Sequence, residues 1–329
     1  MALRVAHSAA EWKAVAQGSP SGGGSGRAVI SVGNFDGLHI GHQRILRAVV
    51  ERARREEAIA AVITFDPHPM KVLRPETAPL LLMTMAQRMA GFEQMGLDAV
   101  LVMQFDDKLA RLSAEDFVRL VLVETVHAKA VLVGTNFRFG HKQTGNVELL
   151  ERIGKRDGFA VEIVHPAAVG GKAVSSTTIR RAVAEGNVEE AAALLGRPFA
   201  LTGPVRAGAG RGSKILFPTL NLAAVQEILP GNGVYATETV LEGKVHRSVT
   251  NVGTRPTFDG IGITVESHLF DYSGAVSPGA LEVRFWKRLR AERKFDGPDA
   301  LRAQIEMDIK SAKDYFQKRE SHTVVKSPK

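Results

Sequence analysis

The spacing of apolar residues in the first half of the chain predicts strands that alternate with helices. Val29–Val32 is an uncharged, β-branched run, the composition of a strand buried on both faces of a parallel sheet. Gly33 and Gly37 interrupt it, and from Leu38 onward apolar residues recur at helical spacing. Similar apolar runs follow at Ile59–Phe65, Ala99–Gln104, Ala130–Val133 and Val161–Val164, with a helical stretch at Ser113–Val126. This alternation predicts an α/β domain built on a doubly wound parallel sheet.

The pattern changes after Gly186-Asn187 and a further helix at Val188–Leu195. Short β-branched runs separated by glycines predict a small antiparallel β-barrel. These runs are Gly233–Val240, Val245–Val252, Thr264–Phe270 and Ala280–Phe285. Pro298–Lys318 returns to helical periodicity and predicts a terminal helix that leans on the barrel. We therefore expect two domains, residues 1–187 and 188–329.

Composition narrows the class of protein. The chain has 329 residues, 44% hydrophobic and 24% charged, which is ordinary for a globular protein with two cores. It has no cysteine, which excludes disulfides and thiolate metal sites. No apolar run approaches the ~20 residues needed to span a bilayer, and no signal peptide is evident. We expect a cytoplasmic protein with no membrane partner.

The net charge of +8 raises the question of nucleic acid. From Leu281 onward thirteen Lys or Arg face eight Asp or Glu, with aromatic residues such as Trp286 and Tyr315 among them. Aromatics in a strand end and a terminal helix are usually core residues, and no RNA-binding signature accompanies them. A solvated basic helix explains the charge equally well. We therefore expect no nucleic-acid partner.

Two histidines stand where the first strand turns into a helix. The first N–H groups of a helix lack partners within it and attract anions. His39 and His42, three residues apart, project from one turn, and Gly41 between them leaves room for a phosphate. Two imidazoles there can neutralise charge that develops on a phosphate oxygen. The alternatives are a helix cap and a metal site, although no third ligand sits at a familiar spacing.

Two further segments offer polar groups to a nucleotide. Asp66 and His68 follow the strand at Ile59–Phe65 and would lie at the carboxyl edge of the sheet, where ligands bind, unless Asp66 only forms a turn. In Val174–Arg180, V-S-S-T-T-I-R, hydroxyls fit a helix N-cap and Arg180 lies one turn in. Such a helix start offers several donors to a triphosphate, although an ordinary capped helix has the same pattern.

A glycine-rich segment in the second half suggests another phosphate site. Gly208, Gly210 and Gly212 form a loop that can wrap phosphates or merely connect two strands. Thr219 and Asn221 lie two residues apart, on one side of an extended strand. Two neutral oxygen ligands, completed by ATP phosphates and water, suit Mg²⁺.

These motifs carry a resemblance to a known family. G-N-F-D-G-L-H-I-G-H-Q at 33–43 resembles the H-x-G-H signature of nucleotidylyltransferases, in the form of the adenylyltransferase half of bacterial bifunctional riboflavin kinase/FAD synthetases. G-T-N-F-R-F-G at 134–140 and S-S-T-T-I-R at 175–180 are similar to that family's second and third motifs. P-T-L-N at 218–221 resembles the riboflavin kinase P-T-x-N signature, and the segments 251–258 and 264–268 also match.

The resemblance implies a role for each matching residue. In the first domain the catalytic residues would be His39, His42 and Arg180. Nucleotide would contact Gly33, Phe35, Asp36, Gly41, Asn136, Ser176, Thr177 and, in the second domain, Gly208, Gly210 and Gly212. The flavin would contact Asp66, Phe137 and Phe139, although the two phenylalanines alone would suggest core positions.

In the second domain the resemblance implies that Glu266 accepts a proton from a riboflavin hydroxyl, and that Thr219 and Asn221 hold Mg²⁺. Without its neighbouring motifs, Glu266 would be read as a solvent-facing strand residue. The chain departs from the family at Leu216 and Leu220, where relatives usually have Gly and Ala. Leu216 could crowd the glycine loop.

The implied activity has two steps. Riboflavin would be phosphorylated by ATP with Mg²⁺ to FMN, and FMN would then be adenylylated by a second ATP to FAD and pyrophosphate. Riboflavin, FMN and ATP are the expected partners. The alternatives are an FAD synthetase with an inactive kinase domain, and a non-catalytic flavin or nucleotide sensor.

Overall fold

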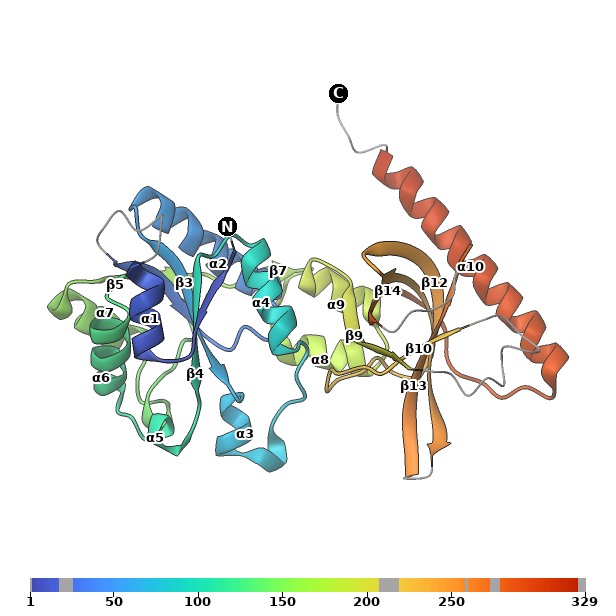
Figure 1. Ribbon diagram of the computed structural model, residues 1–329, viewed down its shortest axis with the longest axis horizontal. Helices are drawn as coiled ribbons and strands as arrows, with labels where there is room; N and C mark the ends of the chain where they lie inside the picture. The colour runs from blue at the N-terminus through green and yellow to red at the C-terminus, as the bar shows by residue number, and fades with distance from the viewer. Residues whose placement is uncertain (1, 18–25, 207–218, 258–259, 273–278, 325–329) are drawn as a thin grey trace. The chain divides into compact units, whose positions relative to one another are not determined.

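The computed structural model describes residues 2–17, 26–206, 219–257, 260–272 and 279–324 (Figure 1). The chain divides into two compact units, Met1–Ser176 and Thr177–Lys329. This division of the chain falls at the start of helix α8, whereas the boundary predicted between residues 187 and 188 lies after that helix. Within the described ranges, no helix is both long and apolar enough to cross a membrane.

The first unit contains a six-stranded sheet in the order β1-β4-β3-β2-β5-β6. All neighbouring strands pair in parallel. The strands are β1 (Arg4–Ala6), β2 (Ala28–Val32), β3 (Ile59–Asp66), β4 (Ala99–Gln104), β5 (Ala128–Gly134) and β6 (Ala160–Val164). This confirms the predicted parallel sheet and its alternation with helices. Strand β1 was not predicted, because three residues are too few to set up a pattern.

Helices cover both faces of the sheet (Figure 1). Five of the α-helices in this unit have more than four residues: α1 (Ala9–Gln17), α2 (Ile40–Arg55), α3 (Pro69–Leu73), α4 (Met85–Gln94) and α7 (Val147–Asp157). The helix predicted at Ser113–Val126 is α6 (Ala114–Phe117), capped by Ser113, running into the π-helical segment η2 (Val118–Thr125). The short elements are α5 (Asp107–Ala110), η1 (Pro75–Thr77), η3 (His141–Gln143), β7 (Ala168–Val169) and β8 (Lys172–Ala173).

The central strand β2 is buried along its whole length, as its uncharged sequence predicts. Ala28, Ile30 and Val32 join a core cluster that also contains Trp12 and Phe117, on the face covered by α1, α6, η2 and α7. The residues between them point to the opposite face, because side chains alternate along a strand.

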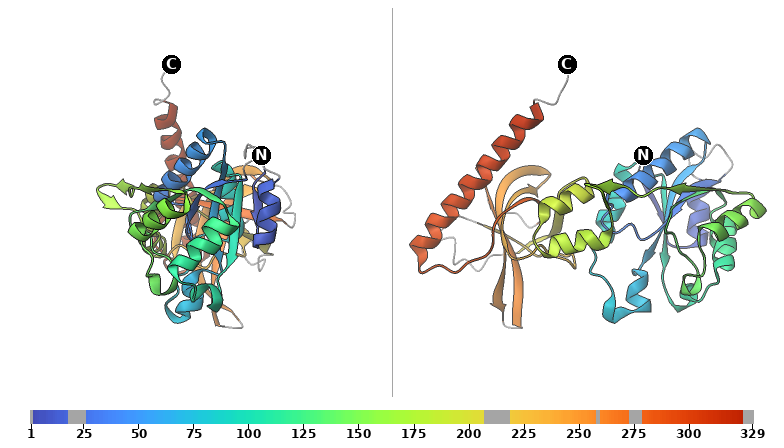
Figure 2. Two further views of the ribbon diagram at one scale, coloured as in Figure 1. Left: turned by 90° about the vertical axis from the view of Figure 1, so that its left-hand side faces the viewer. Right: turned by 180° about the vertical axis from the view of Figure 1, so that it is seen from behind.

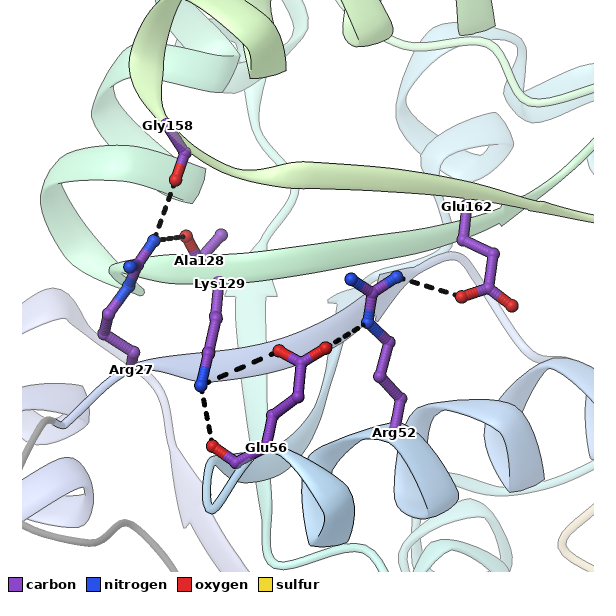
Figure 3. Close-up of polar contacts among 7 residues, drawn as sticks. All are labelled: Arg27, Arg52, Glu56, Ala128, Lys129, Gly158 and Glu162. Atoms are coloured by element: carbon purple, nitrogen blue, oxygen red, sulfur yellow. Dashed lines mark hydrogen bonds and ion pairs between the residues drawn. The ribbon is translucent and has the colours of Figure 1, made fainter.

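Ion pairs connect the end of α2 to strands β5 and β6 (Figure 3). Arg52 contacts Glu56 at 2.8 Å and Glu162 of β6 at 3.0 Å, and Lys129 of β5 lies 3.7 Å from Glu56. Arg27, just before β2, donates to backbone carbonyls of β5 and of the turn after α7. These contacts fix α2, whose first turn carries the histidines.

The second unit contains a closed antiparallel barrel in the order β10-β13-β12-β11-β14-β9. Its elements are α8 (Ser176–Ala184), α9 (Val188–Leu195), β9 (Phe199–Arg206), β10 (Leu220–Leu222), β11 (Gly233–Leu241), β12 (Lys244–Thr257), β13 (Gly260–Leu269), β14 (Ala280–Arg290) and α10 (Pro298–Val324). The barrel and the terminal helix are confirmed. Strand β9 was missed because Gly203 and Pro204 interrupt its pattern.

The barrel interior is partly polar. Thr237, Thr239, Ser248, Thr250 and Ser267 are fully buried, and their hydroxyls form a continuous hydrogen-bonded chain across β11, β12 and β13. Each of these hydroxyls has a partner, which removes most of the cost of burying it.

Helix α10 packs on the outside of the barrel and appears in the right-hand view of Figure 2 as one unbroken helix. Ala312 and Phe316 of α10 form a cluster with Val234, Ala236 and other residues of the barrel wall. Phe285 is buried among the barrel strands. Phe285 and Phe316 of the basic C-terminal segment are therefore core residues, and Trp286 and Tyr315 are partly buried against the cluster of Phe316.

Candidate active sites

The first candidate site lies where the order of the sheet reverses. From β2 the chain continues to β3 on one side, and the later strand β5 pairs with β2 on the other. Ligands of open α/β sheets bind outside the carboxyl ends of the strands at such a point. Gly33, Asp66 and Gly134 mark the carboxyl ends of β2, β3 and β5. The histidine motif at 33–43, Asp66 and the segment 134–140 thus begin or end at one edge of the sheet.

The loop between β2 and α2 has an unusual backbone. Phe35, Gly37 and Leu38 have φ values of 50°, 85° and 43°, in the left-handed region. Such angles persist in Phe and Leu only where surrounding contacts hold them. The buried ring of Phe35 lies beside Gly33, where an added Cβ would come within 3.2 Å of it. Phe35 and Gly33, both predicted to touch nucleotide, therefore also pack against each other.

The two histidines stack at the start of α2. His39 is the N-cap, and its Nδ1 accepts a hydrogen bond of 3.2 Å from the His42 backbone N–H. The two rings are nearly parallel, with centroids 3.6 Å apart. A Cβ on Gly41 would lie 3.2 Å from the His39 ring, so this glycine makes room for the imidazole as well as for a ligand. The helix-cap alternative therefore describes His39 correctly, while the pair still projects from one turn.

Burial controls the charge of this pair. His39 is only 6% exposed, and His42 is half-buried beside Phe35, with ring centroids 5.2 Å apart. Burial, and then the neighbouring His39, hold the pKa of His42 well below 6.5. The Nδ1 atom of His42 is buried and has no hydrogen-bond partner in the described part of the chain. His42 is therefore neutral at pH 7 in the free protein.

Asp36 joins the first and third motifs. Its buried carboxylate accepts hydrogen bonds of 3.0 and 3.1 Å from the backbone N–H groups of Leu82 and Met83. Its backbone carbonyl accepts a bond of 2.9 Å from the Ser176 hydroxyl. The structure thus brings Ser176 to the loop at residues 33–39 that leads into the histidines, called the histidine loop below. It also shows that the Asp36 carboxylate holds the backbone at Leu82 and Met83. A direct contact of Asp36 with nucleotide stays a prediction.

The remaining predicted residues of the first site differ in exposure. Asp66 and Asn136 are exposed at the edge of the sheet. Phe137 is half-buried and stacks on Phe139, with ring centroids 5.3 Å apart. Phe139 is only 7% exposed, and its ring packs 6.0 Å from that of Phe117 within the core. Of the two phenylalanines, Phe137 is therefore the one with surface to offer a flavin.

Thr177 and Arg180 follow Ser176 in the third motif. Thr177 is exposed and Arg180 half-buried in α8, and both belong to the second unit. Gly208, Gly210, Gly212 and Leu216 lie outside the described residues.

The second candidate site is set by the register of three barrel strands. Asn221 of β10 pairs with Glu266 of β13, and Glu266 pairs with Asn251 of β12. Paired residues in antiparallel strands project from the same face of the sheet. These half-buried side chains form one row on the outer face of the barrel, and exposed Thr219 immediately precedes β10. The predicted base and one predicted metal ligand are therefore direct neighbours.

Leu220 points the other way from this row. It is 9% exposed and pairs with the buried Ser267, so its side chain faces the barrel interior. The larger residue at this family position thus fills core space and leaves the outer face clear.

Sequence reasoning gave no role to Asn251 or Glu292. Asn251 pairs with Glu266, and Glu292 follows β14. A Cβ on Gly253 would lie 2.6 Å from the Glu292 carboxylate and 3.2 Å from the Asn251 amide nitrogen. Glycine at 253 is therefore what lets these two groups approach, and only the strand register reveals it.

Two residues of the first site, Asn34 and Arg88, were also missed. The side-chain amide of Asn34 contacts Nε2 of the buried His68 at 3.1 Å. Arg88 of α4 is 3% exposed and donates a bond of 3.0 Å to the Asn34 carbonyl. No local pattern singles out these residues, because their roles depend on contacts between distant segments.

The described residues contain no group of three or more His, Cys, Asp or Glu side chains that could hold a metal ion. The residues that pair with the predicted base across the strands are Asn221 and Asn251, whose side chains offer neutral amide oxygens. Neutral oxygens of this kind can serve a metal ion whose other ligands come from a nucleotide and water.

Comparison with known proteins matches both units. The family model for FAD synthetase matches residues 24–178, and the family model for riboflavin kinase matches residues 195–316. A bifunctional riboflavin kinase/FMN adenylyltransferase of Haemophilus influenzae is 36% identical over 288 residues, covering 87% of this chain and 94% of that one. The protein of the same name from Escherichia coli is 36% identical over 289 residues, 88% of this chain and 92% of that one.

A crystal structure from Streptococcus pneumoniae, described as a macrolide-efflux protein, is also similar. It has a TM-score of 0.83 and 28% sequence identity, over 95% of this chain and 99% of that one. Neither alternative, a single active domain or a sensor, gains support from these likenesses. With both family models matched in order and such similar relatives along most of their length, the chain belongs to the family of bifunctional riboflavin kinase/FMN adenylyltransferases.

Proposed function

We propose that the chain converts riboflavin to FMN in its barrel unit and FMN to FAD in its parallel-sheet unit, each step consuming one ATP. The proposal is supported by two observations: each unit matches one family model, and in each unit the side chains that we propose to react are close neighbours. The stacked histidines lie at the switch point of the sheet, and Glu266 lies in register with Asn221.

In the kinase step Glu266 is the general base. Its carboxylate accepts the proton of the terminal ribityl hydroxyl while that oxygen attacks the γ-phosphorus of ATP and ADP leaves. Asn251 and Asn221 flank Glu266 in the same row and orient the groups on either side of it. Because the row lies on strands of a closed barrel, the base and its neighbours are held at fixed spacing.

In the adenylylation step the FMN phosphate is itself the nucleophile. One of its oxygens attacks the α-phosphorus of the second ATP, and pyrophosphate leaves without a covalent enzyme intermediate. The start of α2 offers backbone N–H groups, and His39 and His42 lie there to stabilise charge on the phosphates. His42 is neutral in the free protein. The negative charge of bound phosphates then raises its pKa and favours uptake of a proton.

The kinase step also needs a divalent cation, and Mg²⁺ fits the donors present. Thr219 and Asn221 supply a hydroxyl and an amide oxygen beside the proposed base, and hard oxygen donors are those that Mg²⁺ prefers. When bound, Mg²⁺ neutralises charge on the ATP phosphates.

The test is incubation of the full chain with riboflavin, ATP and Mg²⁺, followed by chromatography of the flavins. We expect FMN to appear first and FAD to follow from it, with ADP and pyrophosphate as the other products. Formation of FAD from FMN but no FMN from riboflavin would remove the kinase step. If neither flavin nucleotide forms, the whole proposal is wrong.

A further inference from the structure

Helix α4 touches the histidine loop at several points, and the most unusual of them is a buried charge. The guanidinium of Arg88 is 3% exposed and forms no ion pair with a carboxylate in the described part of the chain. Its Nη1 donates to the Asn34 carbonyl at 3.0 Å and lies 3.4 Å from the Thr64 hydroxyl, while its Nε is buried without a partner. Burying a guanidinium with so few partners costs free energy that a hydrophobic side chain would not.

The residues around Arg88 show which parts of the fold this buried guanidinium connects. Asn34 begins the loop in which Phe35 and Leu38 have left-handed backbone angles, and this loop leads directly into His39. The Asn34 side chain in turn contacts His68, which follows β3. Arg88 therefore joins the histidine loop to the end of β3, and burial lowers its pKa while Asp36 and Asp66 act in the opposite direction.

Other residues of the same helix support the same loop. A Cβ on Gly91 would fall 2.2 Å from Leu38 Cδ1, and the rings of Phe92 and Phe35 meet edge to face at 5.8 Å. Because residues three and four apart project from one side of a helix, Arg88, Gly91 and Phe92 form one continuous face. Three contacts to three loop residues fix a backbone that would not hold these angles alone.

We propose that Arg88 is a positioning residue for adenylylation, holding the Asn34 carbonyl so that His39 and His42 meet the phosphates in reactive geometry. The inference rests on the proposed function of the first unit. Arg88 itself touches no substrate in this account. Its effect passes through the backbone of the loop, where displacements of about 1 Å can change rates about 100-fold.

The test compares Arg88→Met, Arg88→Lys and the matched control Arg54→Met. Arg54 belongs to the same unit and pairs with the buried Asp98 at 2.6 and 2.8 Å, beyond the opposite end of the sheet from the histidine loop. The rates of FMN adenylylation and of riboflavin phosphorylation are measured on each preparation, together with the thermal unfolding temperature. Assays are run well below that temperature, with ATP and FMN varied separately to divide kcat from KM.

We expect Arg88→Met to lower kcat for adenylylation about 10- to 100-fold and to leave riboflavin phosphorylation within about twofold. Arg88→Lys should recover part of the loss, since an ammonium group can still donate to the Asn34 carbonyl. Arg54→Met should lower the unfolding temperature while kcat stays near that of the unchanged chain.

The inference is overturned if Arg88→Met keeps the full kcat, or if its kcat falls no further than that of Arg54→Met. If Arg88→Met does not fold, Arg88→Lys decides: a reduced kcat with unchanged phosphorylation supports the inference, and an unchanged kcat refutes it. The unchanged chain is assayed first. If it makes no FAD, the proposed function fails, whereas a full kcat in the variants refutes only the role of Arg88.

Discussion

The two candidate sites of this molecule are held in place in different ways. In the first unit, the histidines follow a loop with left-handed residues, which contacts from α4 and from the backbone at Leu82 and Met83 hold in shape. In the second unit, Glu266 lies on a strand, and its neighbours Asn221 and Asn251 are set by the register of a closed barrel. The geometry of the loop site therefore depends on a few individual contacts, whereas the geometry of the barrel site depends on the pairing of all the barrel strands.

The difference extends to the polar groups beneath each site. Under the histidine loop a charged guanidinium, Arg88, is buried with few partners. Behind the Glu266 row lies a chain of neutral hydroxyls, each bonded to the next. Single changes near the first site should therefore alter its rate more readily than its fold, and changes within the barrel should do the reverse.

The largest expected effect separates the two reactions at the barrel. Glu266→Gln keeps the shape of the side chain but cannot accept the proton, so riboflavin phosphorylation should fall by about 10²- to 10⁴-fold. FMN adenylylation, measured on the same sample with FMN supplied, should stay unchanged. Loss of both activities from this substitution would mean that one site serves both reactions.

The second effect is the converse at the loop. His42→Ala removes one of the two stacked imidazoles, and adenylylation should fall by about 10²- to 10³-fold, as when one group that stabilises transition-state charge is deleted. With riboflavin and ATP supplied, FMN should accumulate at its normal rate. Chromatography of the flavins over time checks this, and a slowed appearance of FMN would contradict it.

A smaller effect should appear in stability, and in the barrel alone. Thr250→Val breaks the hydroxyl chain and leaves the buried Ser267 hydroxyl without its partner, which should cost about 1–3 kcal/mol. Thr254→Val, an exposed position on the same strand, is the matched control and should change stability by less than about 0.5 kcal/mol. Urea unfolding followed by the fluorescence of Trp286, with Trp12→Phe in both variants, measures the difference. Equal values for the two would show that the chain of hydroxyls contributes nothing.

The smallest effect concerns pH and the first unit. Because the folded pKa of His42 lies below 6.5, the unfolded chain binds more protons there, so this residue's contribution is present above pH 6.5 and is lost below it. The thermal unfolding temperature of the first unit, followed by Trp12 fluorescence, should therefore fall more between pH 7 and pH 5 in the unchanged chain than in His42→Gln. Parallel pH curves for the two proteins would show that His42 titrates normally.

Much of the fold follows from local pattern, and the exceptions have physical causes. The buried runs at β2 to β5 predict the sheet because strands covered on both faces leave a nearly uninterrupted apolar signal. Strand β1 is too short to leave one, and Gly203 and Pro204 disguise β9. The histidine pair was also predictable, since residues three apart at a helix start must be neighbours.

The supports of each site were not predictable in this way. Arg88 is an ordinary arginine in the sequence, and only its approach to Asn34, fifty-four positions earlier, distinguishes it. Asn251 lies beside Glu266 through strand pairing, and Glu292 approaches Asn251 across the space left by Gly253. Local sequence specifies which groups could react, while their surroundings come from segments that meet only in the folded chain.

The most direct test of two independent sites is a complementation assay. Glu266→Gln and His42→Ala are each incubated with riboflavin, ATP and Mg²⁺, alone and then mixed in one tube. We predict little FMN or FAD from the first variant and FMN without FAD from the second. The mixture should make FAD, because FMN released by the barrel of one chain is adenylylated by the other. A mixture that makes no more FAD than either variant alone would contradict the assignment of one reaction to each unit.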